Sequence, residues 1–338
     1  MSAFDSVAAF DRALRSLPGP DAGSIEAARR RQAALTKPAG SLGRLEEIAL
    51  FLAGWQGRAR PRIERGRAAI FAGNHGVAAR GVSAFPPEVT AQMVANFRAG
   101  GAAINALAAA AGLELHVTPI ALDRPTADFT IAPAMDESEC LEALSAGAAA
   151  VTPDFDLIVL GEMGIGNSTA AAALAALCFG GPAEQWVGPG TGVAGDALAR
   201  KADVVGRAIA RHGSAPRTPF EMLRRVGGRE IAAMAGAVLA ARLARVPVML
   251  DGYIGCAAVA PLAAAYPAIT AHCLAGHRSA EPAHGRLLAR LGLAPLLDLG
   301  MRLGEGSGGA VAVAVVRAAL AAHDGMATFA EAGVSGGS

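Results

Sequence analysis

Residues 157–169 read Leu-Ile-Val-Leu-Gly-Glu-Met-Gly-Ile-Gly-Asn-Ser-Thr. The apolar start predicts a buried strand, and the glycines followed by small polar residues predict a turn into a helix. Glycines at a helix N-terminus expose unpaired N–H groups at the positive end of the helix dipole, an arrangement that binds phosphate. Gly164, Gly166 and Asn167 are therefore candidate ligands of an anion. The alternative is a tight strand-to-helix turn that binds nothing.

The same pattern of short apolar runs, glycines and helical stretches continues on both sides of this unit. Strands are expected at residues 68–72, 115–120, 157–160, 185–187, 246–250 and 269–274. Helices are expected between them, near residues 88–111, 138–150, 168–178, 195–211, 229–245 and 255–265. This alternation predicts an α/β protein with a parallel, Rossmann-like sheet, helices on both faces, and ligands bound beyond the carboxyl ends of the strands.

The chain is expected to form two domains. Residues 66–285 hold the alternating pattern and form the α/β substrate-binding domain. Residues 1–65 and 286–338 show helix-like spacing of apolar residues, apart from a glycine-rich loop around Glu305. We expect these two segments to form a small helical domain that carries the catalytic loop.

Composition excludes several classes of function. The chain has 338 residues, and 30 Lys and Arg against 29 Asp and Glu leave a net charge of +1. Because the basic residues are scattered, neither nucleic acid nor a membrane is expected as a partner. The cysteines form no CxxC pair, and no apolar run is long enough to span a bilayer. Residues 1–5 lack the basic start of a signal peptide, so we expect a cytoplasmic protein with reduced thiols.

One carboxylate stands alone in residues 301–309, which read Met-Arg-Leu-Gly-Glu-Gly-Ser-Gly-Gly. Glycines on both sides of Glu305 let the backbone turn freely and let another molecule approach closely. The apolar stretch from Ala310 to Ala322 predicts a helix directly afterwards. A lone acid on such a loop has little structural reason to be there, so Glu305 is the first candidate for a role on a ligand.

Glu162 begins the glycine loop of residues 161–169. A phosphate would repel its charge, so we expect Glu162 to face sugar hydroxyls or a base; the alternative is a carboxylate that caps local N–H groups. The loop also resembles a dinucleotide-binding fingerprint in part. After Gly164 and Gly166, that fingerprint needs a third glycine at position 169, which is Thr169, so it fails.

Lysine is rare in this chain, since only Lys37 and Lys201 occur among 30 basic residues. A lysine that persists can mark a place where a compact ammonium is needed, although chance is the alternative. Lys201 follows a second glycine-rich loop, residues 188–192, on the next predicted helix. We therefore expect Lys201 to supply a second contact to the anion.

A predicted helix after residue 87 has an apolar face that includes Val89 and Met93, with Phe85 just before it. Packing in the core is the simplest explanation of such a face. Phe85 and Met93 could instead line a flat apolar slot, because methionine and aromatic side chains suit planar ligands.

Histidines gather near residue 277, but they do not predict a metal site. His272, His277 and His284 match no common set of zinc ligands by spacing. We expect no metal, and we expect the polar run from His277 to Glu281, which includes Ser279, at the rim of a pocket.

Five segments together resemble one known family. They are residues 37–46 (Lys-Pro-Ala-Gly-Ser-Leu-Gly-Arg-Leu-Glu), 161–169, 246–252 (Val-Pro-Val-Met-Leu-Asp-Gly), 277–281 (His-Arg-Ser-Ala-Glu) and 301–308. In order and spacing they are similar to the nicotinate-nucleotide–dimethylbenzimidazole phosphoribosyltransferases of cobalamin biosynthesis. The resemblance covers nearly the whole chain.

This resemblance implies transfer of the phosphoribosyl group from nicotinate mononucleotide to dimethylbenzimidazole. The products would be nicotinate and α-ribazole phosphate, the precursor of the lower ligand of cobalamin. The family's general base, the glutamate of a Leu-Gly-Glu-Gly segment, corresponds to Glu305. The family also implies a homodimer that uses no metal and no cofactor.

The resemblance also implies roles in substrate binding. The family binds the phosphate at the loop that matches Gly164, Gly166 and Asn167, with a lysine that aligns with Lys201, and its equivalent of Glu162 lies near the reacting groups. Ser279, Leu303 and Gly304 lie in matching segments and are further candidates for substrate contact. Two alternatives from other classes stay open at this point: a nicotinamide-dinucleotide oxidoreductase and a non-catalytic nucleotide-binding protein.

Overall fold

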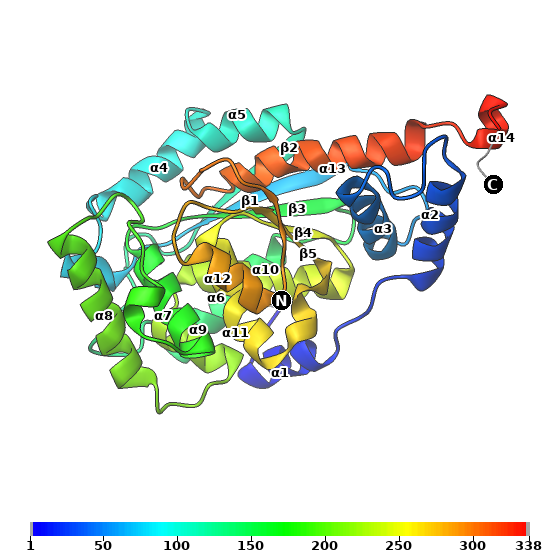
Figure 1. Ribbon diagram of the computed structural model, residues 1–338. Helices are drawn as coiled ribbons and strands as arrows, with labels where there is room; N and C mark the ends of the chain where they lie inside the picture. The colour runs from blue at the N-terminus through cyan, green and yellow to red at the C-terminus, as the bar shows by residue number, and fades with distance from the viewer. Residues whose placement is uncertain (1–2, 336–338) are drawn as a thin grey trace.

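A six-stranded parallel sheet runs through the molecule in the order β2-β1-β3-β4-β5-β6 (Figure 1). The computed structural model describes residues 3–335. Met1 and Ser2, which begin the segment predicted to lack a signal peptide, lie outside the described residues, as do residues 336–338. The strands are β1 (Gly66–Ala72), β2 (Leu113–Pro119), β3 (Leu157–Met163), β4 (Val248–Leu250), β5 (Cys273–His277) and β6 (Pro295–Leu297). The prediction of an α/β fold with a parallel sheet is confirmed.

Helices connect the strands and cover both faces of the sheet. They are α1 (Val7–Arg15), α2 (Ala22–Ala34), α3 (Arg44–Gln56), α4 (Glu88–Ala99), α5 (Ala103–Ala110), α6 (Glu137–Ala149), α7 (Asn167–Phe179), α8 (Asp196–His212), α9 (Pro219–Val226), α10 (Arg229–Ala244), α11 (Tyr253–Ala265), α12 (His284–Leu291), α13 (Ser307–Gly325) and α14 (Phe329–Ala332). Short 3-10 helices are η1 (Gly76–Arg80), η2 (Ala183–Gln185) and η3 (Pro267–His272).

Successive residues of the inner strands β1, β3, β4 and β5 point into two separate apolar cores. Ala69 and Phe71 of β1 belong to the core built with α6, α7, α10 and α11. Ala68 and Ile70 belong to the other core, built with α3, α5 and α13. Figure 1 shows α5 and α13 on one side of the sheet and α7, α10 and α11 on the other. Because both of their faces are buried, β3, β4 and most of β1 read as continuous apolar runs in the sequence.

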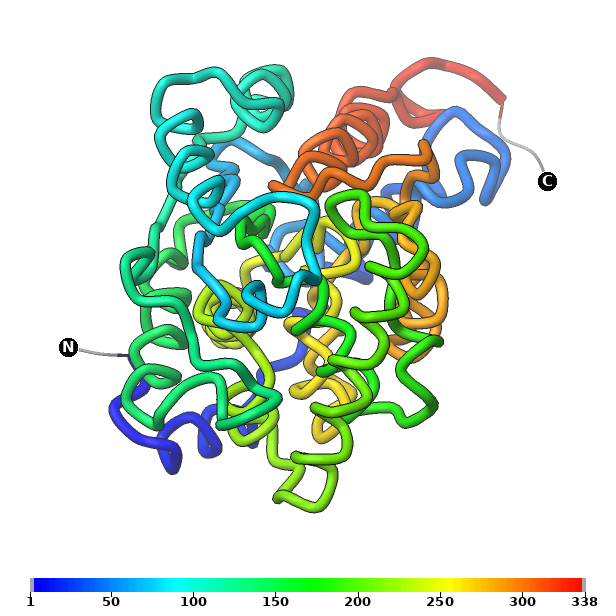
Figure 2. Tube along the Cα trace, turned by 90° about the vertical axis from the view of Figure 1, so that its left-hand side faces the viewer, coloured from blue at the N-terminus to red at the C-terminus, as the bar shows by residue number. Residues whose placement is uncertain are grey.

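The first and last parts of the chain meet beside the sheet. α3 packs against α13, whereas α1 packs against α10 on the opposite face. Both views place α1 and α14 far apart on the molecule (Figure 1 and Figure 2). The division into an α/β domain and a small helical domain stays a prediction.

The strand predicted at residues 185–187 is wrong. Gln185 is the last residue of η2, and the next residue, Trp186, is buried, with its indole N–H donating to the Gly180 carbonyl at 2.8 Å. A run of three residues, of which only Trp186 and Val187 are apolar, is too short to distinguish a strand from a buried turn.

Three further predictions need correction. Residues 88–111 form two helices, because Gly100 adopts a left-handed conformation (φ 81°) and ends α4. The expectation of helix alone after residue 285 misses β6, an edge strand of three half-buried residues. In addition, the strand predicted at residues 269–274 begins only at Cys273, after η3.

The carboxyl ends of β1, β3, β4 and β5 lie at the same edge of the sheet, because all the strands are parallel. The loop before α13 reaches this edge too: a Cβ added to Gly161 would lie 2.5 Å from the backbone nitrogen of Gly306. Only glycine at position 161 allows so close an approach. Among residues 3–335, no helix combines the length and the apolar character that crossing a membrane requires.

Candidate active site

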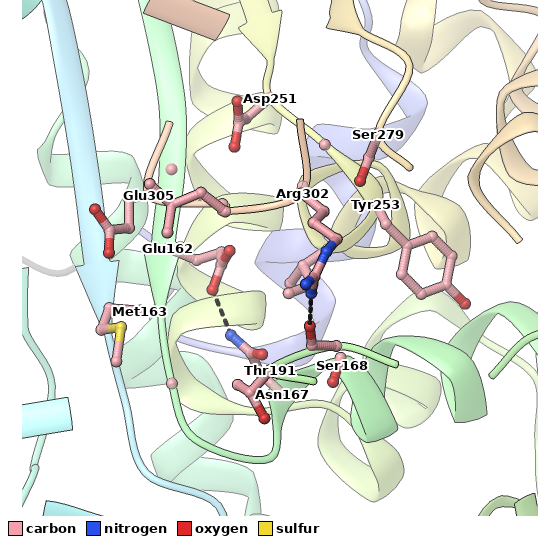
Figure 3. Close-up of a pocket in the computed structure, with 18 of the residues that line it drawn as sticks. Glu162, Met163, Asn167, Ser168, Thr191, Asp251, Tyr253, Ser279, Arg302 and Glu305 are labelled. Atoms are coloured by element: carbon pink, nitrogen blue, oxygen red, sulfur yellow. Dashed lines mark hydrogen bonds between the residues drawn. The ribbon is translucent and has the colours of Figure 1, made fainter. Parts of the chain in front are cut away.

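A cavity of about 670 Å³ opens at the carboxyl edge of the sheet (Figure 3). Its lining residues are Phe85, Val89, Met93, residues 160–165, Asn167, Ser168, Gly190, Thr191, residues 251–255, His277, Ser279, Glu281 and residues 302–305. All the predicted site residues except Gly166 and Lys201 are among them. The fold therefore brings together predicted site residues that are far apart in the chain.

The loop between β3 and α7 makes a tight turn into the first turn of the helix. Gly166 is the N-cap of α7 with φ 97°, in the left-handed region that favours glycine, and it lies behind the cavity. A Cβ on Gly164 would lie 2.6 Å from the carbonyl oxygen of Gly73. Asn167 and Ser168, the first residues of α7, line the cavity, so the positive end of the helix dipole faces it.

Lys201 lies behind the cavity wall and does not line it. Its ammonium donates to Ser168 Oγ at 2.9 Å and to the Gly188 carbonyl at 2.8 Å. A Cβ on Gly190 would be 3.0 Å from Nζ. Burial lowers the pKa of Lys201 to about 8, against a smaller opposing effect of Glu281. Lys201 thus brings positive charge to the cavity through Ser168 and Gly190, both lining residues.

The second glycine-rich loop, residues 188–192, is held from two sides. Glu281 accepts a hydrogen bond from the Gly190 N–H at 2.8 Å, and Arg302 donates to the Gly190 carbonyl at 3.1 Å. Arg302 belongs to the segment that leads to Glu305, so this bond joins the second glycine loop to the loop before α13 (Figure 3).

Glu305 is a buried carboxylate in a strained backbone conformation. Its φ is 62°, in the left-handed region, and its neighbours Gly304 and Gly306 have φ 84° and 78°. Non-glycine residues in this region are uncommon, and such strain gathers at functional sites. Glu305 is only 5% exposed, and burial raises its pKa. A carboxylate with a raised pKa is a stronger base than an exposed one.

Glu162 is the second buried carboxylate of the cavity. Burial raises its pKa to about 8, the charges of Glu230 and Asp251 add to the shift, and a hydrogen bond from the Asn167 side chain opposes it. Gly304 lies directly against it, since a Cβ there would collide with Glu162 Oε1. In Figure 3 Glu162 turns toward Asn167, while Glu305 lies on the side of Met163. The two acids therefore lie at the same end of the cavity, but their carboxyl groups point in different directions.

An apolar slot lies beside these carboxylates. Val89 and Met93 lie one turn apart on α4, and Phe85, which is 53% exposed, precedes the helix. Thr90 of α4 accepts the Ile165 N–H at 3.1 Å, which fixes the helix against the glycine loop. The α4 face is thus split between cavity and core, as Val94 and Phe97 are buried.

Asp251, Tyr253 and Arg302 line the cavity but were not among the predicted site residues, although Asp251 and Arg302 lie in the segments 246–252 and 301–308 that resemble the family. Asp251 follows β4 directly, as Glu162 stands at the end of β3, so its position at a strand's carboxyl end was the available signal. Tyr253 reads as an ordinary helix residue, and its hydroxyl donates to the Trp186 carbonyl at 2.7 Å. In the described chain, residues 3–335, no three His, Cys, Asp or Glu side chains group closely enough to hold a metal ion.

Comparisons with known proteins agree with this geometry. A family model described as "Phosphoribosyltransferase" matches residues 17–334. A nicotinate-nucleotide–dimethylbenzimidazole phosphoribosyltransferase of Novosphingobium aromaticivorans is 71% identical over 337 residues, covering 100% of both chains. The chain belongs to this family. The phosphoribosyltransferase of the same name from Cereibacter sphaeroides is 59% identical over 334 residues and covers 99% of both chains.

Solved structures of this phosphoribosyltransferase family show the same fold. The crystal structure of the Thermus thermophilus enzyme superposes with a TM-score of 0.87 and 42% sequence identity. The match covers 94% of this chain and 100% of that one. Membership of a phosphoribosyltransferase family sets aside the oxidoreductase and the non-catalytic alternatives.

Proposed function

We propose that the protein transfers the phosphoribosyl group of nicotinate mononucleotide to dimethylbenzimidazole, forming α-ribazole phosphate and nicotinate in the assembly of the lower ligand of cobalamin. One observation carries the proposal. A single cavity combines a helix N-terminus suited to phosphate, a buried carboxylate of raised pKa, and an apolar slot beside that carboxylate.

The donor's phosphate binds at the first turn of α7. The N–H groups of this turn attract an anion, and Ser168 adds a hydroxyl whose oxygen is already fixed by Lys201. This geometry makes Lys201 an indirect contributor, since its ammonium reaches the phosphate site through Ser168 and Gly190. The charge of Lys201 still favours the anion across this short distance.

The acceptor ring lies in the slot of Phe85, Val89 and Met93, where aromatic and thioether groups suit a flat apolar molecule. Alignment of donor and acceptor in such a slot can lower the barrier by roughly 7–11 kcal/mol. Ser279, Leu303 and Gly304 complete the enclosure around the reacting groups.

Glu305 acts as the general base. One acceptor nitrogen attacks C1′ of the ribose, and the bond from C1′ to the pyridine nitrogen breaks. Its electron pair returns to the cationic ring, so nicotinate leaves without a general acid. The proton on the other acceptor nitrogen passes to Glu305. Attack from the opposite face inverts the anomeric centre, from β donor to α product.

Two effects on the basicity of Glu305 oppose each other. The N-terminus of α13 follows directly and favours the carboxylate form, which weakens a base. Burial against apolar groups disfavours the charged form, and the pKa of Glu305 is raised. Burial therefore prevails, and Glu305 is a stronger base than an exposed glutamate.

Glu162 is mostly protonated at neutral pH, because its pKa is raised to about 8. A neutral carboxylic acid can donate a hydrogen bond to a ribose oxygen without repelling the donor's phosphate. Glu162 thereby holds the ribose while leaving the acceptor proton to Glu305.

The active form is a cytoplasmic homodimer that needs no metal and no cofactor. Phe85 and Leu303 line the cavity yet are 53% and 57% exposed, and Leu299 nearby in the chain is 61% exposed. Large apolar side chains at the mouth of a cavity suit contact with a second subunit. A second copy of the chain would cover this mouth and exclude water from the reaction.

The reaction is tested by mixing the protein with nicotinate mononucleotide and dimethylbenzimidazole. We expect equal amounts of nicotinate and a phosphorylated nucleoside whose anomeric proton and carbon signals in NMR show the α configuration. Omission of dimethylbenzimidazole should abolish nicotinate release. Binding of nicotinate mononucleotide without nicotinate release would contradict the proposal, and a β product would contradict the direct displacement.

A further inference from the structure

Asp251 is a buried carboxylate that the reaction described above does not use. It follows β4 and is 3% exposed. Its Oδ1 accepts the Gly309 N–H at 2.7 Å, and its Oδ2 accepts the Gly306 N–H at 3.2 Å. Both N–H groups belong to the beginning of α13, so this one side chain joins the end of β4 to the start of the helix that follows Glu305.

The surroundings of Asp251 disfavour the charged form of its side chain. Burial raises the pKa of Asp251 to about 7, hydrogen bonds from the helix N-terminus oppose the shift, and the charge of Glu305 adds to it. The nearest basic group on β5 is His277, whose Nε2 is 3.6 Å from Asp251 Oδ1, and burial lowers the pKa of His277. No close cation therefore offsets the burial of Asp251 within residues 3–335.

The backbone around this carboxylate is packed too closely to move freely. A Cβ on Gly309 would lie 2.7 Å from Val159 Cγ1 and 3.5 Å from the Cα of Asp251. A Cβ on Gly308 would collide with the His277 ring. The first turn of α13 thus packs closely against the ends of the strands, and the hydrogen bonds to Asp251 fix the position of this turn.

Glu305 precedes Gly306 and adopts the left-handed conformation that ordinary residues avoid. The hydrogen bond from the Gly306 N–H to Asp251 acts on the peptide group that joins these two residues. Such strained conformations persist only when surrounding contacts fix them. We infer that Asp251 is a positioning residue that holds the Glu305 carboxylate in its reactive place by fixing the N-terminus of α13. This inference rests on the proposed role of Glu305 as the base.

Asp251 also takes the anion position at the N-terminus of α13. Its oxygens accept two of the free N–H groups there, so these groups are not available to the Glu305 carboxylate. Asp251 thus takes part of the stabilisation that this helix N-terminus gives to an anion, so the N-terminus of α13 weakens Glu305 less as a base.

The test compares Asp251→Asn and Asp251→Ala with a matched control, Asp156→Asn. Asp156 is also buried, and its Oδ2 accepts two backbone N–H groups, from Glu64 at 2.8 Å and Arg65 at 3.0 Å, but at the opposite end of β3. Loss of the hydrogen bonds to Asp156 should lower the free energy of unfolding and leave kcat unchanged. Asn at 251 keeps one oxygen that can accept the Gly309 N–H, so it should partly preserve the rate that Ala loses.

We expect Asp251→Asn to lower kcat at least about 10-fold with KM for nicotinate mononucleotide within about 3-fold, and Asp251→Ala to lower kcat further. In a Glu305→Gln background, either substitution of Asp251 should lower kcat little further, because the Glu305 carboxylate that Asp251 positions is already absent. An unchanged kcat in folded Asp251→Ala overturns the inference. Equal and additive losses in both backgrounds also overturn it, since they indicate a role independent of Glu305.

Hydrogen exchange on the unaltered enzyme provides a test that does not depend on variants. The amides of Gly306 and Gly309 should exchange far more slowly than unbonded loop amides, and exchange at the unbonded rate overturns the inference. The proposed function fails separately: if Glu305→Gln keeps its turnover, the base assignment is wrong. If Glu305→Gln loses turnover while Asp251→Ala keeps it, only the role of Asp251 is wrong.

Discussion

At the scale of single residues, the site depends on ionisable groups whose surroundings set their charge. Glu305 and Glu162 are both buried, but only Glu162 accepts a hydrogen bond from an amide side chain, that of Asn167, and the charges of Glu230 and Asp251 add to the rise of its pKa. Burial raises the pKa of both carboxylates, and for Glu162 the neighbouring acids raise it further, to about 8. The proposed function assigns the part of the base to Glu305 and that of a neutral hydrogen-bond donor to Glu162.

Lys201→Ala should weaken the donor's binding without altering the fold of the sheet. Removal of a charged group that hydrogen-bonds at the phosphate site costs about 1.5–3 kcal/mol, or roughly 10- to 150-fold in KM for nicotinate mononucleotide. A dephosphorylated donor, nicotinate riboside, serves as the comparison, and its KM should change little. An equal loss for both donors would show that Lys201 does not act on the phosphate.

Glu162→Gln should change how stability depends on pH. The folded protein holds the Glu162 proton up to a pKa of about 8, whereas the unfolded chain releases it near 4.5. Because the folded pKa is raised, the proton stabilises the fold at low pH, and this contribution is lost as pH rises from about 4.5 to 8. Gln mimics the protonated acid at every pH.

The Tm difference between Glu162→Gln and the unaltered protein should therefore grow in favour of the variant between about pH 5.5 and pH 8.5. Thermal unfolding in one buffer series checks this. The exposed Glu114→Gln is the control, since its side chain pairs with Arg67 at the surface and should give a constant difference. A difference for Glu162→Gln that does not change with pH would mean that the acid is ionised in the fold.

At the scale of elements, the loop from β3 to α7 is the most tightly fitted part of the site. Gly164 lies between the Gly73 carbonyl and the Glu230 carboxylate, which in turn is 2.5 Å from His75 Nε2. Both side chains of that pair are buried, so the loop has a polar but rigid support. The N-terminus of α7 can therefore bind a phosphate without first being ordered by it.

Gly164→Ala should damage this loop by contact alone. Its Cβ would lie 2.6 Å from a backbone oxygen that cannot move easily, so we expect a loss of about 1–3 kcal/mol in the free energy of unfolding. Donor affinity should fall as well, because the first turn of α7 is displaced. Gly206→Ala in α8 is the control, since no atom lies within 4 Å of its Cβ and alanine favours a helix. Equal stability of the two variants would contradict the fitted loop.

At the scale of the whole molecule, the alternation of apolar runs and helices was sufficient to predict the parallel sheet. The same pattern placed Glu162 and the glycine loop at a carboxyl edge, because that edge is shared by all the parallel strands. Glu305 was predicted from its isolation between glycines. The resemblance to the family joined these segments into one predicted site.

What the sequence could not predict depends on contacts between distant parts of the chain. The strand β6 is too short to show a period, and its pairing with β5 decides its conformation. Lys201 aligned with the phosphate site, but only packing shows that Ser168 stands between its ammonium and the cavity. Asp251 gains its role from two N–H groups that lie 55 and 58 residues away in the chain.

The whole arrangement puts one base at the end of one cavity, so Glu305→Gln is the most direct test. Gln keeps the size and the hydrogen-bonding capacity of the side chain but cannot accept the acceptor's proton. With nicotinate mononucleotide and dimethylbenzimidazole at saturation, we expect kcat to fall by about 10²–10⁴-fold, with Tm and KM for nicotinate mononucleotide nearly unchanged. Turnover within a few-fold of the unaltered enzyme would contradict the account.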